Sequence, residues 1–261
     1  MNDQPGEVMV LADADALAVV AAERLMAWLT KAVESRGTAH VALTGGSSAT
    51  GLYKELRRLP ADALDWSSVH LWWGDDRYVP LDHPDSNAGT AYALLGIGEV
   101  ADAGVAPAES VPVPVVNVHP VTTGEGGAVL AAERYTAEIR AHVPADEEGR
   151  PAFDLILLGM GPDGHILSVF PGSAALDPGV PAVMPIPAPS HVEPHVERVI
   201  LTPGVLPAAR HILVMVTGSA KAGMVRRVLS GNRDPSRWPA QLAVRPNATW
   251  LLDRASAASL A

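Results

Sequence analysis

The segment formed by residues 153–172, FDLILLGMGPDGHILSVFPG, constrains the fold of this chain more than any other. Its first six residues carry one charge and no alternation of polar and apolar side chains, which is typical of a strand covered on both faces of a parallel sheet. Gly159, Gly161 and Gly164 then predict a tight turn in which the backbone can approach a ligand closely. Because ligands bind beyond the carboxyl ends of the strands in open α/β sheets, we expect His165 to face a crevice.

Strand and helix patterns alternate along the rest of the chain, which favours a parallel sheet. We expect strands at 7–11, 40–43, 69–73, 153–158, 196–202, 211–217 and 249–252, and helices at 14–34, 49–59, 88–95, 127–142 and 220–229. The proline-rich stretches 96–123 and 178–194 are expected to be connections, the first with one short strand at 113–118. We therefore predict a single α/β domain over residues 1–261, Rossmann-like, with a mostly parallel sheet and helices on both faces.

Charge and cysteine content narrow the classes of partner and compartment. A formal charge of −10 argues against nucleic acid or an anionic membrane as partner, because both require a dense basic face. The absence of cysteine excludes disulfides, thiolate catalysis and zinc held by sulfur, and is compatible with a reducing compartment. The N-terminal residues do not form a targeting pattern and the longest apolar run there, 16–22, is too short to cross a bilayer, so we expect a cytoplasmic protein.

Four turns that follow predicted strands carry groups suited to an anionic, oxygen-rich ligand. The first, residues 44–48, offers the backbone N–H groups of Gly45 and Gly46, the hydroxyl of Ser47 and the N-terminus of a helix. These groups favour binding of a phosphate. Taken alone, the same turn is also compatible with an ordinary strand-to-helix connection with a serine cap.

Two further turns supply cations, which are scarce enough in this acidic chain to be informative. Residues 74–78 place Asp75 beside Arg77, whose guanidinium can bind a phosphate through two N–H groups. Lys221 lies at a strand-to-helix junction, with Arg198 on the neighbouring strand. A surface ion pair and a solvated lysine are the alternative interpretations of these residues.

The remaining turn sets Asp163 two residues before His165, which suits a histidine that acts as a general base. A histidine pair elsewhere in the chain, His191 and His195, has the i, i+4 spacing of metal ligands on a helix. Pro194 would disrupt such a helix, so we predict no metal there. No serine-hydrolase elbow and no nucleotide-binding P-loop pattern is present either.

Four blocks of the sequence, in this order, resemble the 6-phosphogluconolactonases, part of a larger group with the glucosamine-6-phosphate deaminases and ribose-5-phosphate isomerases. The blocks are ALTGGSSATGLYKEL, WWGDDRYVPLDHPDSNAGT, FDLILLGMGPDGHILSVFPG and ERVILTPGVLPAARHILVMVTGSAKAGMVRRVL. The resemblance implies the fold of that group and hydrolysis of 6-phospho-D-glucono-1,5-lactone to 6-phosphogluconate, in the oxidative pentose phosphate pathway, with no cofactor and no metal. The expected partner is this small phosphorylated lactone, for a monomer or weak homodimer.

The resemblance also implies roles for the residues above. His165 would activate a water molecule for attack on the lactone carbonyl, and Asp163 or Asp75 would orient it or stabilise its protonated form. Six groups would hold the 6-phosphate and the developing oxyanion, and the resemblance does not say which group binds which of the two. These groups are Gly45, Gly46, Ser47, Arg77, Arg198 and Lys221.

Departures from the family pattern leave two alternatives open. Ile166-Leu167 stands where the family commonly has Thr-Ala, and Ser48-Ala49 stands where Thr-Pro is usual. Asp76 stands where Glu is usual, and it is therefore left out of the predicted catalytic set. Ile166 is closer to the aminosugar-phosphate deaminases, although the Asn-Glu that continues their pattern is absent. A non-catalytic sugar-phosphate sensor is the other alternative, but such regulators usually carry a basic DNA-binding module, which the sequence does not show.

Overall fold

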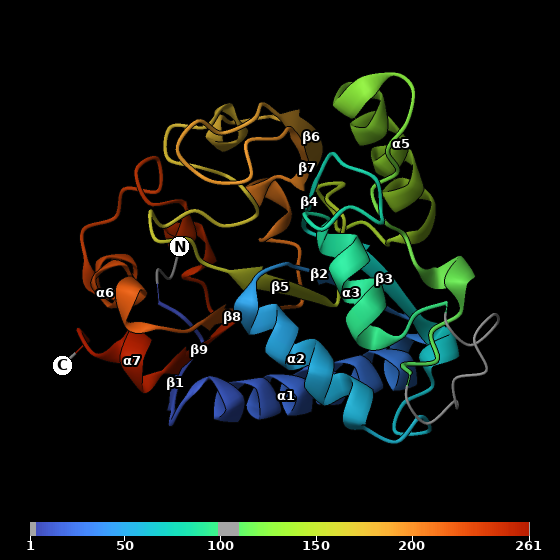
Figure 1. Cartoon of the computed structure of the whole chain (residues 1–261), viewed down its shortest axis with the longest axis horizontal. Coiled ribbons are helices and arrows are strands. Elements are labelled where there is room, and N and C mark those ends of the chain that lie inside the picture. Colours follow the sequence, from blue (N-terminus) through green and yellow to red (C-terminus); the bar gives the residue numbers. More distant parts are fainter. Residues whose placement is uncertain (1–3, 99–109, 261) are drawn as a thin grey trace.

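The computed structural model describes residues 4–98 and 110–260 (Figure 1). Within them, six strands form a parallel sheet in the order β1-β9-β8-β5-β2-β3, with every neighbouring pair parallel. These strands are β1 (Glu7–Leu11), β2 (Ala39–Leu43), β3 (Val69–Trp73), β5 (Leu155–Gly159), β8 (His211–Val216) and β9 (Ala248–Asp253). All six were predicted from their apolar runs, to within three residues at either end.

Alternate side chains of the main sheet pack into two hydrophobic clusters, one on each face. Leu155 and Leu157 of β5 face the cluster covered by α1 (Ala14–Arg36), α2 (Ser47–Arg58) and α3 (Asn87–Leu95). The next residues along, Ile156 and Leu158, face the cluster that contains α5 (Gly127–His142) and α6 (Ala222–Ser230). Figure 1 shows these two groups of helices on opposite sides of the sheet. The predicted mostly parallel sheet with helices on both faces is therefore confirmed.

A second sheet, antiparallel and three-stranded, corrects two predictions. It consists of β4 (Asp75–Arg77), β7 (Arg198–Leu201) and β6 (Val183–Ile186). Residues 74–78 were expected to be a turn, and 178–194 a connection without a strand. Both expectations were wrong because the short polar β4 and the proline-flanked β6 become strands only by pairing with the distant β7.

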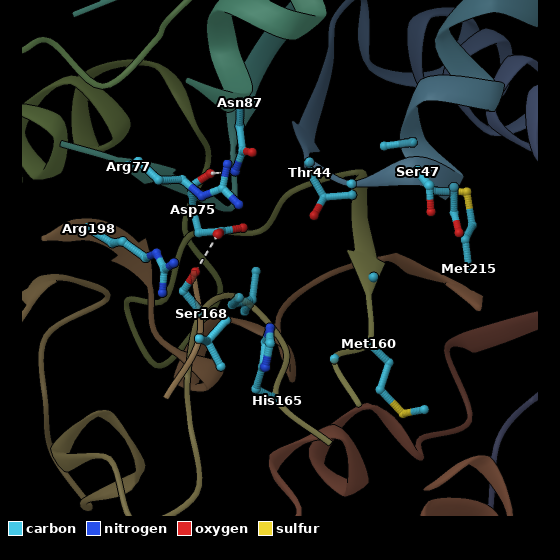
Figure 2. A pocket seen from close by; sticks show the side chains of 18 of the residues that line it. Thr44, Ser47, Asp75, Arg77, Asn87, Met160, His165, Ser168, Arg198 and Met215 are labelled. Atoms are coloured by element: carbon cyan, nitrogen blue, oxygen red, sulfur yellow. Dashed lines mark hydrogen bonds between the residues drawn. The ribbon is translucent and has the colours of Figure 1, made fainter. Parts of the chain in front are cut away.

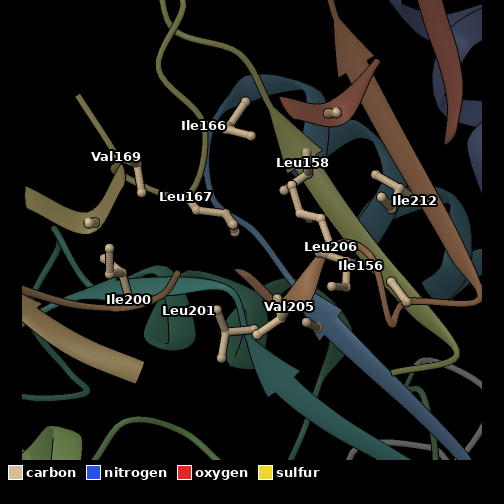
Figure 3. Close-up of a cluster of buried hydrophobic side chains, with 14 of the residues drawn as sticks. Ile156, Leu158, Ile166, Leu167, Val169, Ile200, Leu201, Val205, Leu206 and Ile212 are labelled. Atoms are coloured by element: carbon tan, nitrogen blue, oxygen red, sulfur yellow. The ribbon is translucent and has the colours of Figure 1, made fainter. Parts of the chain in front are cut away.

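Gly74 joins the two sheets. Its N–H donates to the carbonyl of Leu43 in β2 at 2.8 Å, and its own carbonyl accepts from the N–H of Leu201 in β7 at 2.7 Å. The space between the sheets is filled by apolar side chains of the β5 region and of β7, among them Leu167 and Val169 (Figure 3). The second sheet is thereby held over the carboxyl end of the first.

Smaller differences concern the connections. The strand predicted at 113–118 is wrong, because Val115–Asn117 forms a 3-10 helix after Pro114, while residues 99–109 of that stretch lie outside the described residues. Helix α2 begins at Ser47, two residues earlier than predicted. In the described residues, no helix is long and apolar enough to cross a membrane. The remaining short elements are α7 (Arg254–Ala257) and the 3-10 turns Trp66–Ser68, Ala174–Leu176, Pro203–Val205, Ser219–Lys221 and Pro239–Ala243.

Candidate active site

A pocket opens at the carboxyl ends of β2, β3, β5 and β8, under the second sheet (Figure 2). It brings together residues from all four turns that the sequence singled out. Eight of the nine predicted site residues line it, and the ninth, Asp163, lies behind His165. The eight are Gly45, Gly46, Ser47, Asp75, Arg77, His165, Arg198 and Lys221.

The glycine-rich turn after β5 presents His165 to the pocket. The N–H of Gly161 donates to the carbonyl of His165 at 2.9 Å, and the N–H of Gly164 donates to the carbonyl of Gly161 at 3.1 Å. A Cβ at position 161 would overlap the ring of His165, so only glycine leaves room for the imidazole here. The turn therefore sets the place of the ring through its backbone as well as through side-chain contacts.

Asp163 holds one nitrogen of that ring. Its Oδ1 lies 2.6 Å from Nδ1 of His165 and also accepts from the backbone N–H of His165 at 3.1 Å. Burial alone would raise the pKa of Asp163, but the hydrogen bonds and the charge offered by His165 outweigh it and lower the pKa to about 2. An ionised carboxylate at Nδ1 fixes the tautomer in which Nε2 is free to accept a proton.

Asp75 has a different partner. Its buried carboxylate accepts a hydrogen bond from the hydroxyl of Ser168 at 2.6 Å, and the carboxylate in contact with His165 is that of Asp163. Of the two orienting groups that the resemblance implied, the geometry thus favours Asp163. Figure 2 shows Asp75 and Ser168 next to each other between His165 and the two arginines.

Sequence reasoning missed Ser168. It follows Leu167 in a tight turn, closed by a bond from the N–H of Val169 to the carbonyl of Ile166 at 2.7 Å, in which both central residues have positive φ, 52° and 55°. Glycine or asparagine usually occupies such positions, so a Leu-Ser pair gives no local signal of this turn. Left-handed backbone at non-glycine residues is typical of functional sites.

Asn87, the residue before the predicted helix at 88–95, was not among the predicted site residues, yet its side chain lines the pocket. Its amide donates to the backbone carbonyl of Asp75 at 2.9 Å, and a Cβ on Gly45 would overlap it. Asp76, left out of the predicted catalytic set, accepts from the backbone N–H groups of Asn87 and Ala88 at 2.7 and 3.0 Å. Burial raises the pKa of Asp76 to about 6 even against these bonds, and its contacts place it at the start of α3.

Two guanidinium groups form one cationic end of the pocket. The side chain of Arg198 is almost fully buried, and its Nε and Nη1 have no hydrogen-bond partner, while Nη2 donates to the carbonyl of Pro194 at 3.2 Å. Arg77 donates from Nη1 to the carbonyl of Asp85 at 2.7 Å and leaves Nε without a partner. Burial lowers the pKa of Arg198, and the charge of Arg77 lowers it further. Buried guanidinium N–H groups without an acceptor favour the binding of an anion.

The N-terminus of α2 and Lys221 form a second cationic end. The helix begins after Gly46, which has a φ of 92°, and neither a capping side chain nor an acidic residue occupies its first turn. Its free N–H groups and the helix dipole therefore favour an anion. Burial lowers the pKa of Lys221, and Asp253 opposes this shift.

His191 and His195 contact different carboxylates. Nε2 of His191 lies 3.4 Å from Oδ2 of Asp163, whereas Nε2 of His195 lies 3.5 Å from Oε1 of Glu193. In the part of the chain that the structure describes, no group of three or more histidine and carboxylate side chains is arranged to hold a metal ion.

Comparisons with known proteins place this pocket in context. A family model described as glucosamine-6-phosphate isomerases/6-phosphogluconolactonase matches residues 12–252. The 6-phosphogluconolactonase of Streptomyces coelicolor is 35% identical over 100% of this chain and 96% of its own length, and that of Mycobacterium tuberculosis is 36% identical over 97% and 98%. The structure of 6-phosphogluconolactonase from Trypanosoma cruzi aligns with a TM-score of 0.82 at 26% identity, covering 100% of this chain and 98% of that one. A monomeric glucosamine-6-phosphate deaminase, at 18% identity and a TM-score of 0.77, shares the fold.

Proposed function

The chain belongs to the family of glucosamine-6-phosphate isomerases and 6-phosphogluconolactonases, and on that premise we propose how its pocket hydrolyses a phosphorylated sugar lactone. The reaction converts 6-phospho-D-glucono-1,5-lactone to 6-phospho-D-gluconate, a step of the oxidative pentose phosphate pathway. The activity rests on curated 6-phosphogluconolactonases that match nearly the whole chain at 35 and 36% identity. The roles of single residues rest on the geometry of the pocket.

His165 is the general base. Its Nδ1 is bound by the ionised Asp163, and its ring lines the pocket, so Nε2 can accept a proton from a water molecule that attacks the carbonyl carbon. Asp163 stabilises the imidazolium, which gives this proton to the ring oxygen when the tetrahedral intermediate collapses and the ring C–O bond breaks, as the histidine of a catalytic triad does for its leaving group. General-base catalysis of this kind contributes roughly 10²- to 10⁴-fold in rate. The Asp163–His165 contact facing a pocket with two cationic ends is the observation that carries the proposal.

Arg198 stabilises the oxyanion that forms on the carbonyl oxygen. Its Cζ lies 5.2 Å from the centre of the Phe170 ring, and the ring of His165 lies 4.7 Å from the same ring. Arg198 and His165 therefore pack against the same phenyl ring, so the guanidinium of Arg198 lies on the same side of the pocket as the general base. Its buried N–H groups without a hydrogen-bond partner are suited to a charge that develops during the reaction. Arg77, opposite Arg198, adds to the positive potential.

The phosphate binds at the other cationic end. Gly45, Gly46 and Ser47 surround the uncapped N-terminus of α2, and Lys221 adds a positive charge beside it. Because the phosphate is remote from the reacting carbon, its binding energy serves to position the ring over His165. Asp75, fixed by Ser168, accepts a hydrogen bond from a ring hydroxyl group and helps to set that position.

Acid release from freshly prepared 6-phosphogluconolactone, followed against the spontaneous rate, tests this function. The parent protein is expected to accelerate it, and His165→Ala is expected to lower kcat at least 10²-fold with little change in melting temperature. Near-normal turnover of this variant would remove His165 from the role of base. Release of ammonia from glucosamine 6-phosphate, without lactone hydrolysis, would instead support a deaminase. The cytoplasmic compartment and a monomeric or weakly dimeric state stay predictions from the sequence.

A further inference from the structure

The second carboxylate oxygen of Asp163 lacks a hydrogen-bond donor. Oδ1 accepts both contacts from His165, whereas Oδ2 is buried and makes no hydrogen bond. A buried acceptor without a donor destabilises the folded site, and a carboxylate held at one oxygen can rotate about its Cβ–Cγ bond. The basic group that faces Oδ2 is Nε2 of His191, at 3.4 Å.

We propose that His191 is a positioning residue for the reaction, which donates from Nε2 to Oδ2 of Asp163 and so fixes the carboxylate that orients His165. The inference rests on the proposed function, because it assigns His191 a task in the same lactone hydrolysis. The present separation is long for an N–H···O bond, so the donation requires the half-exposed ring to move closer and to turn its N–H toward Oδ2. Both the neutral tautomer with a proton on Nε2 and the imidazolium ion can donate it.

Phe170 holds the two histidines around the carboxylate. The ring of His191 meets that of Phe170 edge-on, with centroids 5.2 Å apart and an interplanar angle of 78°. The ring of His165 contacts the same phenyl group at 4.7 Å. Asp163 thus has one imidazole at each oxygen, and Phe170 packs against both rings.

The loop that carries His191 is part of the pocket wall. Its next two residues, Val192 and Glu193, line the pocket, and the backbone of Pro194 accepts from Arg198. A bond between His191 and Asp163 would therefore tie this loop to the base as well as orient the carboxylate. The other half of the pair, His195, contacts Glu193.

The groups around His191 allow its contact with Asp163 to be tested separately from its other contacts. Asp163 and His165 face it from the turn after β5, Arg198 lies across Phe170 on β7, and Glu193 with His195 shares its loop. About half of the His191 side chain is exposed, so its replacement leaves no cavity in the core. His195, equally exposed on the same loop, is a matched control.

Three variants separate the hydrogen bond from packing. His191→Phe keeps a ring against Phe170 but removes the donor, His191→Gln keeps an N–H where Nε2 lies, and His195→Gln changes the same loop elsewhere. We expect His191→Phe to lower kcat roughly fivefold or more, with KM within twofold of the parent, since Asp163 does not touch the substrate. His191→Gln and His195→Gln should stay within twofold of the parent in both constants.

The measurement is kcat and KM on freshly prepared 6-phosphogluconolactone, with the melting temperature of each variant. Parental kcat in His191→Phe overturns the inference, and so does an equal loss in His191→Gln, which would assign the effect to loop packing. The proposed function is tested separately by the parent protein and by His165→Ala. An active parent with an unaffected His191→Phe variant would thus reject His191 alone.

Discussion

Arg77 and Arg198 lie directly opposite each other as partners on the antiparallel strands β4 and β7. Like charges in this position repel, and only 2% of Arg198 is exposed to solvent that could screen the charge. Asp75, whose carboxylate is an opposing charge nearby, is also bound to Ser168. The arginine pair therefore lowers the stability of the folded protein until an anion binds to it. Stability is reduced here in favour of function.

Replacement of Arg198 by methionine tests this trade. The variant removes a buried charge with unpaired N–H groups and keeps a similar volume, so the melting temperature should equal or exceed that of the parent. Loss of the oxyanion contact should lower kcat about 10²- to 10³-fold. Thermal unfolding and steady-state kinetics measure the two effects. Arg140→Met, on an exposed position of α5, is the control that should change neither, and near-parental kcat in Arg198→Met would contradict the oxyanion role.

Lys221→Ala separates the two cationic ends. If the phosphate binds beside Lys221, the variant should raise KM for 6-phosphogluconolactone at least tenfold and leave turnover of unphosphorylated glucono-1,5-lactone unchanged. Arg198→Met should impair both substrates, because both form the same oxyanion. Parallel kinetics on the two lactones make the comparison. Identical patterns in the two variants would show that the pocket does not divide its cations in this way.

The sequence predicts those parts of the fold that have a local physical signature. The main-sheet strand at 155–159 is a continuous apolar run, and Asp13 caps α1 through the backbone N–H of Ala16, so both could be found without long-range information. Strand β4 could not, because Asp75-Asp76-Arg77 is polar and becomes a strand only by pairing with β7, more than 100 residues away. Its polar side chains are compatible with a strand because Asp75 and Arg77 line the pocket and Asp76 accepts from backbone N–H groups at the start of α3.

The residues of the candidate site are likewise predictable only where the sequence carries a local signal. Gly45, Gly46 and His165 follow strands in glycine-rich turns, and that chemistry is visible in the sequence. Ser168 reaches Asp75 only because the backbone at 167 and 168 adopts the left-handed region, which tertiary packing of Leu167 stabilises. Contacts that depend on such strain cannot be derived from local propensity.

A histidine cluster at the amino end of the main sheet predicts acid sensitivity. His40 and His70 are partners on β2 and β3, their rings lie 4.7 Å apart, and His70 contacts His119 at 3.0 Å. Burial, and then the charges of His70, His119 and His142, lower the pKa of His40 to about 3, and burial also lowers the pKa of His70 and His119. These groups bind protons more readily in the unfolded chain than in the folded one.

The sign of the pH dependence follows from these lowered pKa values. Their contribution to stability is fully present above about pH 6.5, the ordinary pKa of histidine, and is lost as the pH falls from there toward 3. The raised pKa of Asp76 acts in the opposite direction over this range, but it is one group against three histidines, so the melting temperature should fall between pH 7 and pH 5. His40→Asn, which keeps an acceptor for the indole N–H of Trp72, should show a shallower fall, while His195→Gln should follow the parent. A melting temperature independent of pH over this range would contradict the prediction.

The end of β5 and the turn after it offer a matched pair of glycines. A Cβ at position 161 would overlap the ring of His165, whereas a Cβ at position 159 meets its nearest atom, the carbonyl oxygen of Gly45, at 3.9 Å. Gly161→Ala should therefore displace the imidazole from Asp163 and lower kcat at least 10²-fold, as loss of the base does. Gly159→Ala, two residues away at the end of β5, should keep most of the activity. Kinetics of both variants and a crystal structure of Gly161→Ala test whether the missing side chain at position 161 is what leaves room for His165. Equal activity of the two variants would contradict this explanation.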